Sequence, residues 1–266
     1  MKSRTKIWLI VATSLVLIGG ILFASVMMSL GGDFAQLSTS KYETNKYKIT
    51  EEFKNISVLA DTADIVFLPG EDATTSITCY EPANAKHSVN VENDTLTIKL
   101  VDTRKWYEYI GIYTRAPKIT VNLPRAEYAS LFVKVNTGDV KLEDISAEKV
   151  DIESDTGDVI LKKLAVTGEI SVENDTGDVK MENVVTTGSI LIESDTGDVH
   201  FKGCDAANLK IETDTGDVIG NLLTDKVFIV ETDTGDVEVP KTVTGGRCEI
   251  NTDTGDIEIR IDNLEK

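Results

Sequence analysis

The sequence predicts an all-β solenoid, a single-stranded parallel β-helix with coils of 19–20 residues, preceded by one N-terminal transmembrane helix. Three observations support this fold class. An Asp-Thr-Gly-Asp-Val motif recurs at nearly constant spacing, apolar residues alternate with polar ones on both sides of it, and an uncharged apolar run lies near the N-terminus.

The N-terminal run covers residues 7–30 and is long enough to cross a bilayer as a helix. Lys2, Arg4 and Lys6 precede it and Asp33 follows it, so the positive-inside rule places residues 1–6 in the cytoplasm. A cleaved signal peptide is the alternative, although its apolar region is normally shorter. We therefore expect a single-pass protein of the cell membrane with an extracytoplasmic C-terminal domain, joined by a polar linker over residues 31–45.

The net charge of the chain is −18. Such an acidic surface repels nucleic acid and anionic lipid headgroups, so nucleic-acid binding is not expected. The partners that this charge favours are cations, basic proteins and neutral glycans.

The repeat is clearest in the spacing of its glycines, which follow one another at steps of 19 or 20 residues. They are Gly138, Gly157, Gly177, Gly197, Gly216, Gly235 and Gly255. A period near twenty with strand-like composition is typical of a solenoid in which each repeat forms one coil stacked on the last.

Val or Ile stands five residues before and two residues after every one of these glycines, as Ile152 and Val159 do for Gly157. Apolar positions two apart, with Glu, Lys, Asp or Ser between them, indicate strands with one face inward. Equivalent strands of successive coils are expected to pair in parallel. A second turn is predicted about halfway round the coil, at Gly168 and Gly188.

The repeat divides the extracytoplasmic part into irregular first coils over residues 46–130 and a regular solenoid over residues 131–266. The segment 61–65 (Asp-Thr-Ala-Asp-Ile) is the same motif with Ala63 in place of glycine, and residues 92–96 resemble it again. Both segments are therefore predicted to be degraded copies.

Asp-Thr-Gly is also the triplet of aspartic proteases, which need two carboxylates facing each other across a cleft. Seven related copies on one ladder do not provide that arrangement, so no catalytic residue is predicted. The glycines are interpreted instead as structural turns, in which Asp or Asn caps backbone N–H groups and Gly adopts a left-handed conformation.

The acidic side chains of the motif form the candidate metal site, because calcium prefers hard carboxylate and carbonyl oxygens. The ten candidates are Asp155, Asp158, Asp175, Asp178, Asp195, Asp198, Asp214, Asp217, Asp233 and Asp236. The repeat lacks the Gly-Gly-x-Gly-x-Asp pattern of calcium-loaded β-rolls. These carboxylates either bind calcium or keep this edge soluble, and no other cofactor is expected.

Cys79, Cys204 and Cys248 are far apart and have no Cys-x-x-Cys spacing, so a metal site is not expected from them. Each follows the strand alternation, which predicts small buried hydrophobic residues without a disulfide. His200 falls on an outward position and is expected at the surface.

An aromatic loop contains Trp106, Tyr107, Tyr109 and Tyr113. It is a possible ligand loop, because aromatic rings can stack on sugars. The alternative is that it covers one end of the solenoid, since terminal coils need protection.

The apolar anchor, the Lys-Trp-Tyr-Glu-Tyr-Ile loop and the Asp-Thr-Gly-Asp-Val repeats resemble the bacterial putative-adhesin domain family of unknown function. The resemblance covers about residues 46–261. It implies a single-stranded β-helix displayed at the cell envelope, and some members of that family are associated with envelope-stress systems. It carries over no catalytic residues.

The sequence therefore favours a non-enzymatic, membrane-anchored adhesin or an envelope binding or scaffold module, with an envelope protein or glycan as partner. A calcium-loaded binding module and an enzyme acting on envelope glycans are the alternatives. The oligomeric state stays open.

Overall fold

The computed structural model describes residues 3–32, 41–70, 72–106 and 115–262. These residues divide into two compact units, one containing the N-terminal helix and the other containing the strands. The helix, α1 (Ser3–Ser29), has a candidate membrane span from Arg4 to Ser29, within which an 18-residue window has a mean hydropathy of 2.5. By length and composition, this stretch can cross a membrane.

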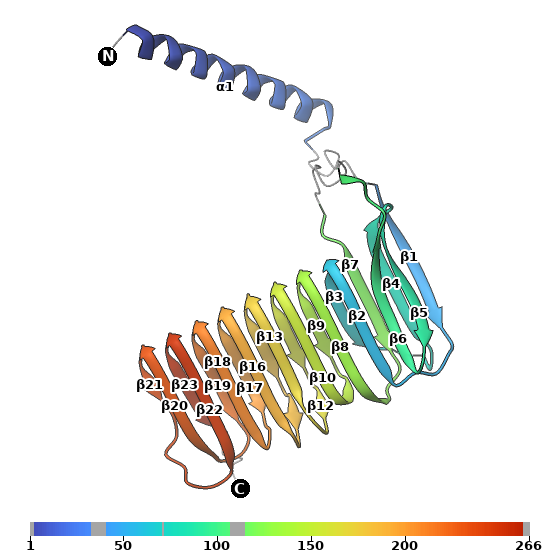
Figure 1. The fold of residues 1–266 in the computed structure, drawn as a ribbon, viewed down its shortest axis with the longest axis vertical. Helices are drawn as coiled ribbons and strands as arrows, with labels where there is room; N and C mark the ends of the chain where they lie inside the picture. The colour runs from blue at the N-terminus through green and yellow to red at the C-terminus, as the bar shows by residue number, and fades with distance from the viewer. Residues whose placement is uncertain (1–2, 33–40, 71, 107–114, 263–266) are drawn as a thin grey trace. The chain divides into compact units, whose positions relative to one another are not determined.

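The strand unit contains two sheets, whose coils stand side by side in Figure 1. We call the 11-stranded sheet A and the 12-stranded one B. In spatial order, sheet A consists of β1 (Tyr42–Ile49), β4 (Thr75–Pro82), β7 (Lys118–Leu123), β3 (Asp64–Pro69), β9 (Val140–Glu143), β11 (Val159–Lys162), β14 (Val179–Glu182), β17 (Val199–Cys204), β19 (Val218–Leu222), β23 (Ile257–Ile261) and β21 (Val237–Glu238).

Sheet B faces sheet A across the apolar interior. In spatial order, its main strands are β5 (Ala85–Glu92), β6 (Thr95–Asp102), β2 (Asn55–Thr62), β8 (Glu127–Thr137), β10 (Ser146–Thr156), β13 (Ile170–Thr176), β16 (Ser189–Thr196), β18 (Asn208–Thr215), β22 (Gly246–Thr254) and β20 (Lys226–Thr234). The short strands β12 (Ala165–Val166) and β15 (Val185–Thr186) also belong to sheet B and lie just before the second turns predicted at Gly168 and Gly188.

The regular coils pair in parallel and keep the motif in register. Thr156 pairs with Thr176, and Val159 pairs with Val179 in the facing sheet. Ile152 and Val159 are fully buried, as the alternation predicts. The parallel strands, the inward columns and the coil length of 19–20 residues predicted from the sequence are therefore confirmed for these coils.

The order of the coils differs from the order of the sequence at both ends. Ile250 of β22 pairs with Ile211 on one side and Val230 on the other, so the last coil is inserted between two earlier ones. The first coil, β2–β3, likewise lies between β6–β7 and β8–β9. The prediction that every coil stacks on its predecessor is therefore wrong at the ends. The connection over residues 239–245 is long enough for the chain to step back past one coil.

Antiparallel strands close the N-terminal end of the strand unit. We call β1, β4 and β5 the N-terminal cap, because β1 pairs antiparallel with β4, β4 with β7, and β5 with β6. The degraded copy predicted at residues 92–96 is wrong. Asn93 and Asp94 have φ angles of 50° and 62° and form a two-residue hairpin turn, which reverses the chain direction. β1 starts at Tyr42, inside the segment predicted as a linker.

All three cysteines are free and buried, so the interpretation of each as a small buried residue without a disulfide is confirmed.

Candidate functional site

The glycine corners are positions at which no side chain fits. Gly157 has a φ of 144°, a conformation that L-residues rarely adopt, and a Cβ at this position would lie 2.2 Å from the carbonyl oxygen of Gly138. The Gly157 N–H donates to the carbonyl of Thr176 at 2.9 Å. The seven predicted turn glycines all share this positive φ and close approach. Glycine is thus required by the stacking of backbones, which fits the structural interpretation of the triplet.

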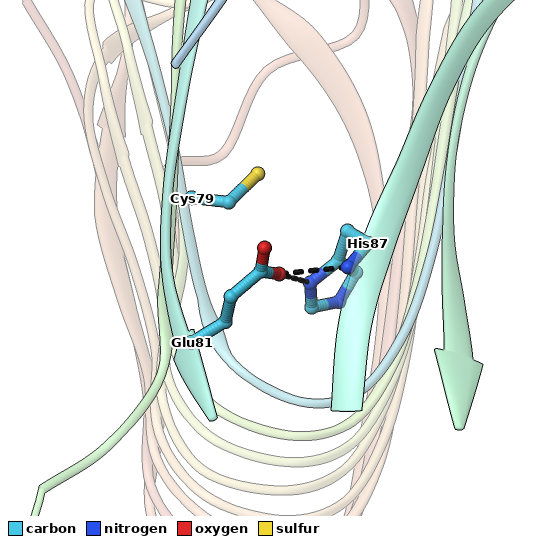
Figure 2. Close-up of side chains that lie close together, drawn as sticks. All are labelled: Cys79, Glu81 and His87. Carbon is cyan, nitrogen blue, oxygen red and sulfur yellow. Dashed lines mark hydrogen bonds and ion pairs between the residues drawn. The ribbon is translucent and has the colours of Figure 1, made fainter. Parts of the chain in front are cut away.

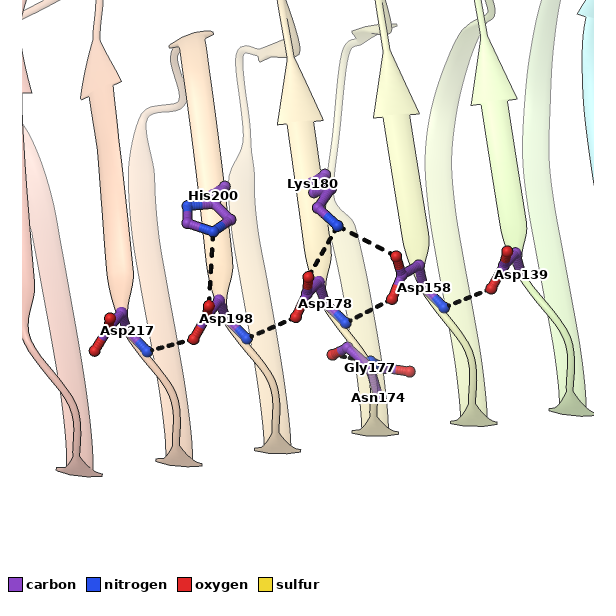
Figure 3. Close-up of polar contacts among 9 residues, drawn as sticks. All are labelled: Asp139, Asp158, Asn174, Gly177, Asp178, Lys180, Asp198, His200 and Asp217. Atoms are coloured by element: carbon purple, nitrogen blue, oxygen red, sulfur yellow. Dashed lines mark hydrogen bonds and ion pairs between the residues drawn. The ribbon is translucent and has the colours of Figure 1, made fainter.

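The aspartate after each glycine takes part in a ladder along the corner (Figure 3). Asp158 N–H donates to Asp139 Oδ1 at 2.9 Å, and Asp178 N–H donates to Asp158 Oδ1 at 3.0 Å. In spatial order the ladder consists of Asp64, Asp139, Asp158, Asp178, Asp198, Asp217, Asp256 and Asp236. Each carboxylate except the last in the series therefore accepts a backbone N–H from its copy one coil further along.

A lysine bridges two members of the ladder on their other oxygens. Lys180 Nζ lies 3.2 Å from Asp158 Oδ2 and 2.8 Å from Asp178 Oδ2 (Figure 3). This hydrogen bond from Lys180 holds the pKa of Asp178 below its ordinary value. Between these two coils a cation is already supplied by the chain itself.

The aspartate before each glycine is placed differently. Asp155, Asp175, Asp195, Asp214 and Asp233 are exposed, on the side of the corner that faces solvent. The ten candidate calcium ligands thus form two parallel columns, one bound to backbone amides and one in water. Whether these columns bind calcium stays a prediction.

A groove of about 520 Å³ lies on the outer face of sheet A, beside the ladder. Ile160 and Ile219 contribute apolar surface, and Gly220 leaves space that the Phe201 ring enters. Four cations and two carboxylates line it: Lys162, Lys180, Lys202, Arg260, Glu182 and Glu258. The lining residues of the groove thus carry more positive than negative charge on a chain that is strongly acidic overall, although Lys180 also meets the carboxylates of the ladder. A larger hollow of about 620 Å³ near Pro124 and Val185 has no such excess of cations.

Lys202 is the cation of this groove that has no acidic side chain within 4.0 Å among the described residues. The other three are paired: Lys162 with Glu182 at 3.0 Å, Lys180 with the ladder, and Arg260 with Glu258. His200 lies at the surface, as predicted, with its Nε2 at 3.8 Å from Asp198 Oδ2. The groove thus offers one unpaired positive charge next to apolar surface.

Of the aromatic ligand loop, only Trp106 belongs to the described residues, and it is exposed. Tyr107, Tyr109 and Tyr113 lie outside them. The prediction of a sugar-binding loop therefore stays a prediction.

A cluster in the N-terminal cap was not predicted from the sequence. Cys79 and Glu81 on β4 face His87 on β5, and all three side chains are buried (Figure 2). Glu81 Oε2 accepts from both the backbone N–H and the ring Nδ1 of His87 at 2.7 Å, and its Oε1 accepts from Asn45 Nδ2 at 2.7 Å.

The sequence profile of the family described as Toastrack DUF4097 matches residues 53–266. The chain belongs to the Toastrack DUF4097 family. The match covers all the regular coils, and it starts just before β2. The comparison with curated proteins gave no match.

Among solved structures, the Toastrack chain is similar to one described as a putative adhesin from Bacteroides fragilis. The two are 19% identical with a TM-score of 0.55, over 83% of this chain and 97% of that one. A structure described as a putative cell adhesion protein from Clostridium sporogenes is 10% identical with a TM-score of 0.34, over 83% and 100% of the two chains. The likeness to the Bacteroides fragilis structure indicates a shared fold.

The buried cluster of this Toastrack chain was missed because its signal is not repeated. Cys79 and Glu81 stand two apart and so share a strand face, and His87 follows after a short corner between the sheets. A Cys-x-Glu pattern followed by His on the next strand could have suggested the cluster. The repeat indicates only the exposed carboxylates as candidate metal ligands.

Proposed function

We propose that the chain is a non-enzymatic, membrane-anchored module of the cell envelope, built as a single-stranded β-helix, that binds an anionic envelope glycan. The helix α1 holds residues 1–6 in the cytoplasm and the strand unit outside in this proposal. The description of the Bacteroides fragilis structure as a putative adhesin supports the binding role. The observation that carries it is the groove on sheet A, with apolar surface and unpaired Lys202.

The groove has the size of an ordinary ligand site, which is typically a few hundred Å³. Its cations are held by β11, β14, β17 and β23, so they belong to a rigid sheet and not to loops. The acidic corner beside the groove repels polyanions, so a ligand reaches the groove only where its own charges meet the lysines. We expect this contrast in charge to determine where on the surface the ligand binds, and to add less to its affinity.

Binding is tested with the full chain in detergent and a polyuronate as the anionic probe, with neutral dextran as the control polymer. Lys202→Glu should weaken polyuronate binding about tenfold, because it removes an unpaired cation and adds a negative charge to the groove. Lys99→Glu is the matched control, since Lys99 is exposed on sheet B and has no acidic partner among the described residues. Equal binding of dextran, or an equal loss with Lys99→Glu, would contradict the proposal.

A calcium-loaded module is the alternative, and the exposed aspartates Asp155, Asp175 and Asp195 support it because their carboxylates are open to solvent. Calorimetric titration of the same preparation with calcium distinguishes the two. Saturable calcium binding that disappears when these three residues become Asn, together with no binding of polyuronate, would favour the alternative.

A further inference from the structure

The buried cluster of Cys79, Glu81 and His87 has the composition of a metal site. One ligand atom from each residue lies within 4.8 Å of the other two. Figure 2 shows Glu81 between Cys79 on the same strand and His87 on the facing strand. We propose that these three side chains bind a zinc ion inside the N-terminal cap.

The position of Glu81 is unusual for this interior. It is fully buried and is the one buried carboxylate among the described residues. A buried charge is costly unless it is paired and hydrogen-bonded. An apolar side chain at this strand position would avoid that cost, as Ile77 does four residues earlier on the same strand face. Hydrogen bonds from Asn45 and His87 offset part of this cost, and a bound cation would offset more of it.

The donor set matches zinc better than calcium. Zinc binds thiolate, imidazole and carboxylate in one site, whereas calcium takes oxygen ligands. Ligand atoms of a tetrahedral zinc site lie about 3.4–3.7 Å apart, which follows from bonds of about 2.0–2.3 Å. The present separations, from 2.7 Å between His87 Nδ1 and Glu81 Oε2 to at most 4.8 Å, bracket that range. Side-chain shifts of about 1 Å bring the three atoms to the metal.

The charges balance once the ion is bound. Burial raises the pKa of the Cys79 thiol to about 12, so the thiol is protonated at neutral pH. Zinc replaces that proton: the S–H bond breaks, a zinc–sulfur bond forms, and H⁺ leaves to solvent. With neutral His87, one thiolate, one carboxylate and Zn²⁺ sum to zero charge. The His87 ring proton moves from Nδ1 to Nε2, which has no hydrogen-bond partner among the described residues.

Groups around the cluster are placed to support the ligands. Asn45 Nδ2 and the backbone N–H of His87 donate to the Glu81 carboxylate, so its orientation is fixed before metal binds. Tyr47 donates to the carbonyl of His87 at 3.1 Å and lies over the cluster from β1. By contrast, Cys204 and Cys248 are equally buried but belong to no such group among the described residues, so they are internal controls.

The test uses the full chain in detergent, carried on a tag without histidine and freed of metal by a chelator. Cobalt is the spectroscopic probe, because a thiolate–cobalt band in the near ultraviolet reports sulfur ligation directly. One equivalent of cobalt should produce this band, and zinc should abolish it. Cys79→Ala and His87→Gln should lose the band, whereas Cys204→Ala and Cys248→Ala should retain it.

One further readout keeps the proposal testable if Cys79→Ala or His87→Gln fails to fold. Asn45→Ala should bind zinc about 10–100-fold more weakly, because it loosens the Glu81 carboxylate without removing a ligand. Absence of the cobalt band in the unmodified chain, or its persistence in Cys79→Ala, would overturn the proposal.

Discussion

The regular coils and the N-terminal cap satisfy their polar groups in opposite ways. In the coils, the carboxylate of Asp158 accepts from the same residue type one coil away, and the interaction is repeated along the corner. In the cap, the carboxylate of Glu81 depends on Asn45 and His87, and nothing duplicates it. Repetition thus divides stability into many small, similar contributions, whereas the cap concentrates it in one buried group.

The largest effect is therefore expected in the cap. Glu81→Ala removes the acceptor of three donors in the interior and should lower the free energy of unfolding by about 3–5 kcal/mol. The measurement is urea unfolding followed by circular dichroism with chelator present, so that metal makes no contribution. The control is Glu193→Ala on the outer face of sheet B, which should change stability by less than about 0.5 kcal/mol. Similar losses for both variants would contradict the comparison.

A smaller but still large effect is expected at a glycine corner of the regular coils. Gly177→Ala places a Cβ 2.2 Å from the carbonyl oxygen of Gly157 at a φ of 133°, so both backbones must shift. The expected loss is about 3 kcal/mol, from backbone strain and weakened hydrogen bonds between the coils.

Thermal or urea unfolding of Gly177→Ala measures this loss directly. Ser171→Ala, on an outward position of the same coil, is the matched control and should be nearly neutral. A stable Gly177→Ala variant would mean that the stacking of glycine on glycine is not what fixes the corner.

Within one motif, the two aspartates should contribute unequally to the free energy of unfolding. Asp178→Ala removes the acceptor of the Asp198 N–H and the partner of Lys180, and should cost about 1 kcal/mol. Asp175→Ala removes an exposed carboxylate of the same corner and should cost less than about 0.5 kcal/mol. Comparing the unfolding midpoints of the two variants checks this difference, and a larger loss for Asp175→Ala would reverse the roles assigned here.

Repetition also explains what the sequence could predict. Seven aligned copies specified the inward positions of Ile152 and Val159 and the corner at Gly157, because an error in one copy would break the register of all others. The same regularity gave no information about the spatial order of the coils. The motif itself does not distinguish an outermost coil from an inner one, since β20 and β22 carry equivalent copies of it.

The candidate sites also divide into a part that the repeat predicts and a part that it does not. The aspartate columns could be located from the sequence, but their use as acceptors for the next coil depends on backbone geometry that the motif alone does not give. Cys79, Glu81 and His87 meet only after the cap folds antiparallel, and His87 reaches Glu81 across a corner between two sheets. Single-copy contacts of this kind leave no periodic signal.

The smallest expected effect is the pH dependence of one ladder carboxylate. The pKa of Asp178 in the folded chain lies below its ordinary value of 3.8, because Lys180 and the Asp198 N–H donate to it. The folded state therefore binds this proton less readily than the unfolded state. The resulting stabilisation is present above the ordinary pKa and is lost as the pH falls through the folded value.

Asp178→Asn isolates this dependence, because the amide keeps an oxygen acceptor for the Asp198 N–H and removes only the charge. At pH 7 this variant should be less stable than the unmodified chain by about 0.5 kcal/mol, a discounted figure because the carboxylate is partly exposed. The difference should shrink as the pH falls below 3.8 and through the lower pKa of folded Asp178. A difference that grows on acidification has the wrong sign for a lowered pKa, and would show that the ladder is held by its backbone amides and not by the charge on Asp178.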